Sequence, residues 1–145
     1  MKVRARVKQV ILFAVCLGYA SQASAQSLPA ELVGTWNVEP SSVRVLGLPP
    51  ACELIRIRYA VDGKVEYASG ELKYKAKATA KDDGKGLTVE EVPYENNGGR
   101  NCQGRSAEFF FSHYASASYI EIRGTEMRVY LLGKEKPISL VYKRD

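Results

Sequence analysis

The sequence predicts an all-β protein, and the fold we expect is a small up-and-down antiparallel β-barrel of about eight strands. Apolar and polar residues alternate with period two in almost every segment from residue 32 onward, and no long stretch shows helical spacing of apolar positions. Short breaks separate the segments, so neighbouring strands should be antiparallel. Closure into a barrel removes both exposed sheet edges, and a two-sheet β-sandwich is the alternative.

The first half of the chain alternates most clearly. Ile57 and Tyr59 alternate with arginines, and Asp62-Gly63 is a turn pair that should reverse the chain. A second turn is expected at residues 82–86, before the last strand of this half. In chain order we expect one helical turn at Leu28–Leu32 and strands at Val33–Val38, Ser42–Leu46, Leu54–Tyr59, Lys64–Ala68, Glu71–Thr79 and Leu87–Val92.

The second half begins with a stretch that is rich in Gly, Asn and Pro. Residues 93–105 should therefore form a loop, pinned at Cys102 and otherwise mobile. Four further strands are expected, separated by breaks at residues 116–118, Gly124 and residues 133–137: Ala107–Tyr114, Tyr119–Arg123, Glu126–Leu132 and Ile138–Lys143.

The N-terminus has the pattern of a secretory signal peptide. Four basic residues precede the short uncharged run from Val10 to Ala20, and Ala23-Ser24-Ala25 offers small residues at the cleavage site. The run is too short to span a membrane. We expect residues 1–25 to be removed, residues 26–145 to form a single barrel domain, and the product to be periplasmic or secreted with no transmembrane segment.

Cleavage would change both the charge and the expected redox state. The first 25 residues carry 4 of the 21 basic residues and no acidic ones, so the remainder has a net charge of only +1 and nucleic acid is not an expected partner. Cys52 and Cys102 would then be the only cysteines left. In an exported chain such a pair predicts a disulfide.

The segment Ala30-Glu31-Leu32-Val33-Gly34-Thr35-Trp36 resembles the start of several small barrel families, including lipocalins, avidins and fatty-acid-binding proteins. It is most similar to the bacterial inhibitors of serralysin-type metalloproteases, in which a Cys and an alternating strand follow. Cys52 and the strand Leu54–Tyr59 occupy those positions here. The resemblance implies that Trp36 closes one barrel end, with Lys143 or Arg144 packing over it.

Three binding functions follow as hypotheses. The leading one is an inhibitor or binding module of the bacterial envelope, acting on an extracellular or periplasmic protease. A carrier of a small apolar ligand and an envelope protein that binds anionic polymers are the alternatives. The candidate contacts are Ser27, Leu28, Asn97, Arg100 and an outward-facing Phe110 for the partner; Trp36, Tyr59, Tyr74, Phe109, Phe111 and Met127 for the ligand cavity; and Lys73, Lys75 and Lys77 for the polymer.

Catalysis is not expected, because the residues for it are scarce. His113 is the only histidine, so neither a multi-histidine metal site nor a histidine-based acid–base pair is available. The pairs Asp82-Asp83 and Glu90-Glu91 offer neighbouring carboxylates. Adjacent strand residues point to opposite faces, however, and the aspartates lie on a turn, so neither pair is well placed for cooperative acid–base work. We expect both pairs to be solvated. The prediction is a monomeric, non-enzymatic protein without cofactor or metal.

Overall fold

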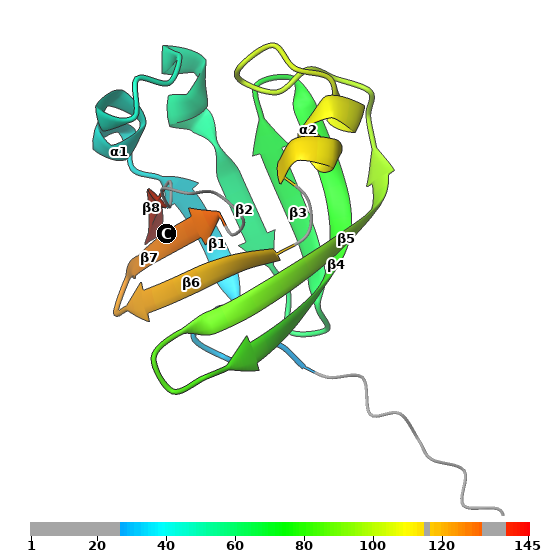
Figure 1. The fold of residues 1–145 in the computed structure, drawn as a ribbon. Helices are drawn as coiled ribbons and strands as arrows, with labels where there is room; N and C mark the ends of the chain where they lie inside the picture. The colour runs from blue at the N-terminus through cyan, green and yellow to red at the C-terminus, as the bar shows by residue number, and fades with distance from the viewer. Residues whose placement is uncertain (1–26, 115–116, 132–138) are drawn as a thin grey trace, which may run out of the picture.

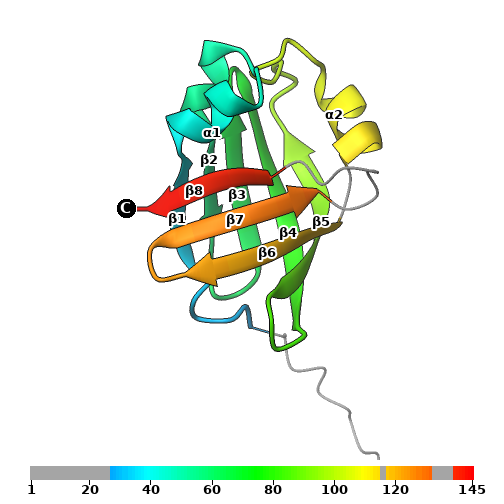
Figure 2. The same cartoon turned by 60° about the vertical axis from the view of Figure 1, so that its left-hand side comes forward.

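Pairing of the first strand with the last closes the sheet of this protein, seen in a computed structural model that describes residues 27–114, 117–131 and 139–145. Eight antiparallel strands follow one another around the barrel in sequence order, as Figures 1 and 2 show. Trp36 of β1 lies opposite Arg144 of β8 in the closing pair. The predicted barrel is confirmed, and the sandwich alternative is wrong. The expected signal peptide and its cleavage after Ala25 lie outside the described residues.

The barrel strands differ in length, and three short helices lie in the connections between them. The elements are β1 (Gly34–Val38), α1 (Pro40–Val45), the 3₁₀ helix η1 (Pro50–Leu54), β2 (Arg56–Tyr59), β3 (Lys64–Ser69), β4 (Leu72–Asp82), β5 (Leu87–Asn96), α2 (Ala107–Tyr114), β6 (Ala117–Arg123), β7 (Glu126–Leu131) and β8 (Ser139–Arg144). No described helix is long and apolar enough to cross a membrane.

The strand predicted at Ser42–Leu46 is wrong, because this segment lies within and just after helix α1. Pro40 occupies the start of the helix, where its missing N–H and fixed φ are tolerated. A strand would place Val43 and Val45 on the same face. The helix separates them instead, with Val43 fully buried and Val45 exposed.

The strand predicted at Ala107–Tyr114 is also wrong, because these residues form α2. Ser106 precedes the helix, and its hydroxyl accepts a hydrogen bond from the backbone N–H of Phe109 at 3.2 Å, which is the N-cap arrangement. Ala107, Phe110 and Phe111 then recur at helical spacing and turn toward the barrel. Phe110 therefore does not point outward from a strand; its ring packs against the core.

Strand β5 is longer than expected and runs on through Pro93 to Asn96. The register with β4 shifts between Lys75 and Ala76, and Ala76 lies opposite Pro93. A bulge of this kind lets the ladder continue past a residue that has no N–H to donate. The extension matters for the site, because it carries the wall of the barrel up to the end that holds the helices.

One end of the barrel is sealed around the only tryptophan of the sequence. Trp36 is fully buried, and its indole N–H donates to the Leu32 carbonyl at 2.9 Å. The guanidinium of Arg144 lies 4.5 Å from the ring centroid, a cation–π contact. Leu28 packs into the same core, with its backbone N–H bonded to the Val61 carbonyl at 3.1 Å. Of the two predicted basic residues, Arg144 is therefore the one over Trp36.

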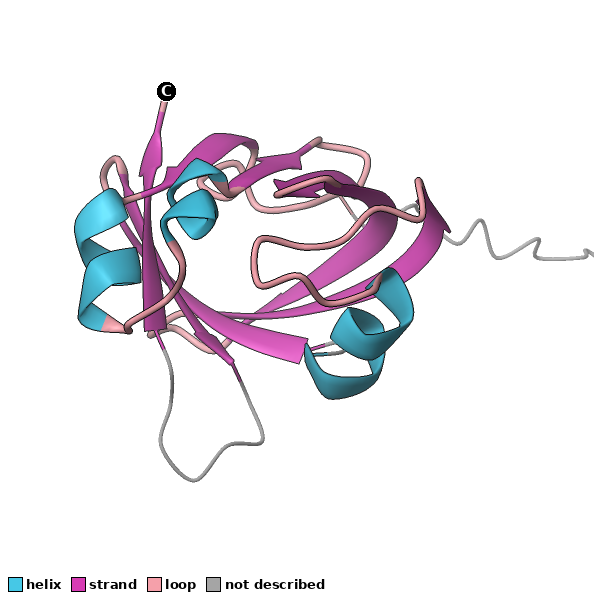
Figure 3. Cartoon of the chain, turned by 90° about the horizontal axis from the view of Figure 1, so that it is seen from above, coloured by secondary structure: helices cyan, strands magenta, loops and turns pink. Residues whose placement is uncertain are grey.

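The opposite end is covered by α1, η1, α2 and the loop of residues 97–106, which we call the cap loop. Seen from above, the helices lie at the edge of the barrel and the cap loop extends across it (Figure 3). A disulfide between Cys52 of η1 and Cys102 joins this loop to the other side of the barrel end. The predicted pairing of these two cysteines is confirmed.

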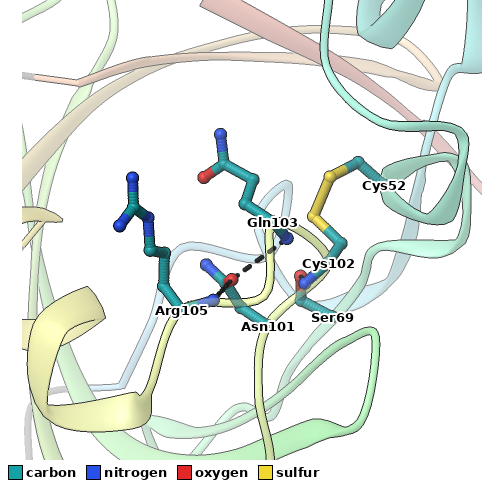
Figure 4. Close-up of a disulfide and its surroundings, with 6 residues drawn as sticks. All are labelled: Cys52, Ser69, Asn101, Cys102, Gln103 and Arg105. Atoms are coloured by element: carbon teal, nitrogen blue, oxygen red, sulfur yellow. Dashed lines mark hydrogen bonds between the residues drawn. A yellow bond between two sulfur atoms is a disulfide. The ribbon is translucent and has the colours of Figure 1, made fainter.

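The cap loop is held at more points than the single cysteine that the sequence indicated. The Arg100 carbonyl accepts the backbone N–H groups of Glu71 and Leu72 at 3.0 and 2.9 Å. Asn101 accepts the backbone N–H groups of Gln103 and Arg105 through its side-chain oxygen, and its neighbour Cys102 is held beside Ser69 (Figure 4). The expectation of a mobile segment anchored at one point is therefore wrong.

Close backbone approach explains two glycines at this end of the barrel, Gly70 and Gly99. Gly70, in the β3–β4 turn, has φ +58°, and a Cβ there would lie 2.9 Å from backbone atoms of Asn101 and Cys102. A Cβ on Gly99 would lie 2.4 Å from the Glu71 carbonyl oxygen. Any side chain at either position would push the cap loop away from the barrel wall.

Removing the disulfide should weaken the protein without changing its barrel topology. We expect Cys52→Ala/Cys102→Ala to lower the free energy of unfolding by up to about 4 kcal/mol, since the bridge restricts a loop of about 50 residues in the unfolded chain. Urea unfolding followed by Trp36 fluorescence measures the loss. Wild-type protein treated with a reductant is the control and should match the variant. Equal stability of the oxidised and reduced wild type would contradict the prediction.

Candidate functional site

A cavity of about 200 Å³ lies inside the barrel at the capped end. Its walls are mostly apolar and come from nearly every part of the fold. Pro93 and Gln103 line it and are themselves exposed, so the cavity reaches the surface beside the cap loop. The lining includes Ile55, Ile57, Tyr59, Tyr67, Tyr74, Glu91, Phe110, Phe111, Val129, Leu140 and Tyr142.

Among the described residues that line the cavity, Glu91 is the one with a carboxylate, and β5 turns it inward. Leu87 and Val89 are buried, and the alternation of the strand puts Glu91 on the same face. Across the ladder it faces the small inward residue Ala78. The side chain of Glu91 is half-buried because it borders the cavity, although protein atoms surround it on the other sides.

Two tyrosine hydroxyls hold the Glu91 carboxylate from different strands. Tyr59 of β2 donates to Oε1 at 2.8 Å, and Tyr74 of β4 donates to Oε2 at 3.0 Å. Both rings are almost completely buried. Each carboxylate oxygen is thus oriented by its own donor, and the orientation does not depend on solvent.

Burial governs the protonation of this cluster. It raises the pKa of Glu91 above the usual value for glutamate, although the hydrogen bonds from Tyr59 and Tyr74 act in the opposite direction. Burial also raises the pKa of Tyr67 to about 12, and it raises the pKa of Tyr59, Tyr74 and Tyr142 well above the ordinary tyrosine value. These hydroxyls therefore keep their protons at neutral pH.

Aromatic rings connect α2 to the barrel wall beside this cluster. Tyr67 stacks on Tyr74 with ring centroids 4.7 Å apart, and Phe110 of α2 stacks on Tyr67 at 5.6 Å. Phe111 meets Tyr74 edge-on at 5.1 Å. Such pairs add stability beyond the area that they bury. The helix is thus seated on the same tyrosines that form the cavity wall.

The predicted cavity residues divide into two groups. Tyr59, Tyr74 and Phe111 do line the cavity. Trp36 and Met127 are fully buried in the core and do not border it. Phe109 lies outside the lining as well, and the Arg105 guanidinium is 4.7 Å from its ring centroid. The expectation that Glu91 is solvated is wrong, because Glu91 lines the cavity and binds Tyr59 and Tyr74. The alternation from Leu87 onward was the signal that could have placed it inward.

The residues predicted to contact a partner do not gather at one place. Ser27 is exposed, whereas Leu28 belongs to the core at the tryptophan end. Asn97 and Arg100 are exposed at the opposite end, where they hold the cap loop together: the Asn97 amide donates to the Glu71 carbonyl, and Arg100 donates to the Gly104 carbonyl.

The predicted lysine row lies on the outer face of β4, as the alternation indicated. Its charges are partly engaged by neighbours. Lys75 pairs with Glu95 at 2.9 Å, and the Lys77 ammonium donates to the Asp62 carbonyl. Lys73 and Lys75 border a surface groove that also contains Glu66 and Glu95. The outer face is therefore of mixed charge.

The fold and the site together define a small closed barrel with an interior cavity and one buried carboxylate. Comparison with protein-family models, with curated proteins and with solved structures found no match for this chain. Among the described residues there is also no cluster of His, Cys, Asp and Glu side chains that could hold a metal ion. The resemblance to protease inhibitors stays a prediction.

The pH dependence of stability tests the burial of Glu91. Because its pKa is raised in the folded protein, the folded form takes up a proton at higher pH than the unfolded chain does. The free energy of unfolding should therefore fall as the pH rises through this pKa. We expect Glu91→Gln, which carries no charge, to be more stable than the wild type at pH 7, and the difference to close as the pH falls to about 4.

Glu90 offers a matched control on the same strand. It is exposed on the outer face, so Glu90→Gln removes the same charge without affecting the cavity. Urea unfolding of the three proteins across the pH range gives the comparison. A Glu91→Gln variant that follows Glu90→Gln at every pH would show that Glu91 is effectively solvated.

Proposed function

We propose that this protein binds a small ligand inside the barrel, at the capped end. The observation that carries the proposal is the cavity of about 200 Å³, which has apolar walls and one oriented carboxylate at Glu91. Binding sites for small molecules commonly combine an apolar lining with a few placed polar groups. A cavity of about 150 Å³ accommodates benzene, so the volume suits a compound with a single ring.

The construction of the capped end supports the same proposal. The cap loop is fixed by the disulfide and by the Asn101 and Arg100 hydrogen bonds, and Phe110 and Phe111 seat α2 on the cavity wall. The exposed residues Pro93 and Gln103 mark where the cavity meets solvent. A ligand would therefore enter a preformed site, and little ordering would be needed on binding.

The inhibitor hypothesis has less support from the described residues. Ser27 and Leu28 are its candidate contacts next to the expected cleavage site, and Leu28 is part of the core. Four statements therefore remain predictions from the sequence: inhibition of an extracellular protease, binding of anionic polymers, export to the envelope and the lack of enzymatic activity.

Filling the cavity should abolish ligand binding. Val129 of β7 lines the cavity, and Val129→Phe would occupy its space. Val92 is 66% exposed on β5, so Val92→Phe is the same substitution on the outer surface. We expect ligand-detected NMR with a library of one-ring compounds to find binders of the wild type and of Val92→Phe, with affinity reduced at least about tenfold in Val129→Phe.

Two further observations decide the outcome. The circular dichroism of both variants should match that of the wild type, which shows that the barrel has formed. Binders that Val129→Phe retains at full affinity would place the site elsewhere. A library without any binder of the wild type would overturn the proposal.

A further inference from the structure

The Glu91 carboxylate has more acceptor capacity than the protein uses. An ionised carboxylate offers about four acceptor positions, and Tyr59 and Tyr74 each occupy one. No lysine, arginine or histidine is present among the described residues that line the cavity. An acid in such a place is costly, because buried charges are normally paired. Within this part of the chain, then, the carboxylate has tyrosine donors but no cation.

The nearest basic residues of the cap loop are turned to other contacts. Arg100 is exposed and donates to the Gly104 carbonyl at 2.9 Å. Arg105 is also exposed, and its guanidinium lies over the ring of Phe109. Neither residue lines the cavity. Among the described residues, therefore, no basic side chain is placed to match the charge of Glu91.

The walls beside Glu91 are of the kind that attracts an organic cation. Tyr67, Tyr74, Phe110 and Phe111 form a continuous set of ring contacts with centroids 4.7 to 6.0 Å apart, and all four border the cavity. Aromatic faces stabilise ammonium groups by cation–π attraction, more strongly where water is excluded. Carboxylate and aromatic faces in the same cavity favour the same ligand charge.

We infer that the ligand is a small organic amine, whose protonated amino group pairs with Glu91 while its apolar body lies against Ile57, Val129 and Leu140. The inference rests on the proposed function and adds the chemical class of the ligand. The hydrogen bond from the ammonium to the carboxylate would be charge-assisted, which makes it stronger than one between neutral groups. A neutral ligand of the same shape would leave the charge of Glu91 unmatched.

The pH dependence of binding follows from the groups that face Glu91. Among the described side chains these are Tyr59 of β2, Tyr67 of β3, Tyr74 of β4 and Tyr142 of β8, and α2 contributes the rings of Phe110 and Phe111 to the lining. The tyrosines keep their protons at and below neutral pH. Amine affinity should therefore fall on acidification as Glu91 is neutralised, while the affinity of a neutral ligand should stay constant.

Three probes of similar shape and different charge test the inference on the full protein. Phenethylamine is cationic, phenethyl alcohol is neutral and phenylacetate is anionic at pH 7. By isothermal titration calorimetry we expect the amine to bind roughly tenfold or more tightly than the alcohol, and the acid to bind most weakly. In Glu91→Gln the ratio of amine to alcohol affinity should approach one, because the charge that favours the amine is gone. Glu90→Gln should retain the wild-type ratio.

The outcomes separate this inference from the proposal beneath it. Equal affinity for amine and alcohol in the wild type, or an amine preference that persists in Glu91→Gln, would overturn the amine assignment. The proposed function would still stand if Val129→Phe lost the alcohol. Absence of binding by all three probes would also overturn the amine assignment. Only a wild type that binds nothing from the wider library would remove both.

Discussion

The hydrogen bonding between β1 and β8 is the constraint on which the rest of the structure depends. Once these strands pair, every strand has two neighbours and alternate side chains must point into a closed interior. A barrel of eight strands has just enough interior for side chains to fill it or to leave room for one small ligand. Here Trp36, Met127 and their neighbours fill one half, and the other half contains the cavity. The site is thus a consequence of incomplete filling at one end.

The strands could be predicted because inward and outward positions differ in polarity along each of them. The alternation in β4, with Leu72 and Tyr74 inward and the lysines outward, survives unchanged in the structure. The two segments that became helices misled the prediction for a local reason. Val43 and Val45 are spaced as on one face of a strand, and the run of three phenylalanines at 109–111 is compatible with a buried strand as well as with a helix. Pro40 and Ser106 were the stronger signals for helices. Proline is favoured at the first position of a helix, and the Ser106 hydroxyl accepts a backbone N–H of the first turn of α2.

Glu91 shows where prediction from the sequence ended. The alternation with Leu87 and Val89 could have predicted its inward direction, but the role of an inward carboxylate depends on the groups around it. The groups around Glu91 include the hydroxyls of Tyr59 and Tyr74, which come from two other strands. Their positions depend on how those strands are aligned with β5 along the barrel. The residue pattern within a single strand does not predict that alignment. The same holds for the cavity, because filled and open barrels share the same alternation.

The buried carboxylate also gives a physical reason for the reinforced cap. Among the described residues, no cation lies beside the acid in this cavity. Such a barrel end loses packing and solvation energy. The compensating contacts lie immediately around it: the Cys52–Cys102 disulfide, the Asn101 hydrogen bonds, and the rings of Phe110 and Phe111 on the tyrosines. Most of these contacts do not involve Glu91 itself, so the cap can be stable while the acid stays available. A cation that entered the cavity would then form an ion pair with Glu91, which the protein lacks without a ligand among its described residues. This ion pair would make the bound form more stable than the free form.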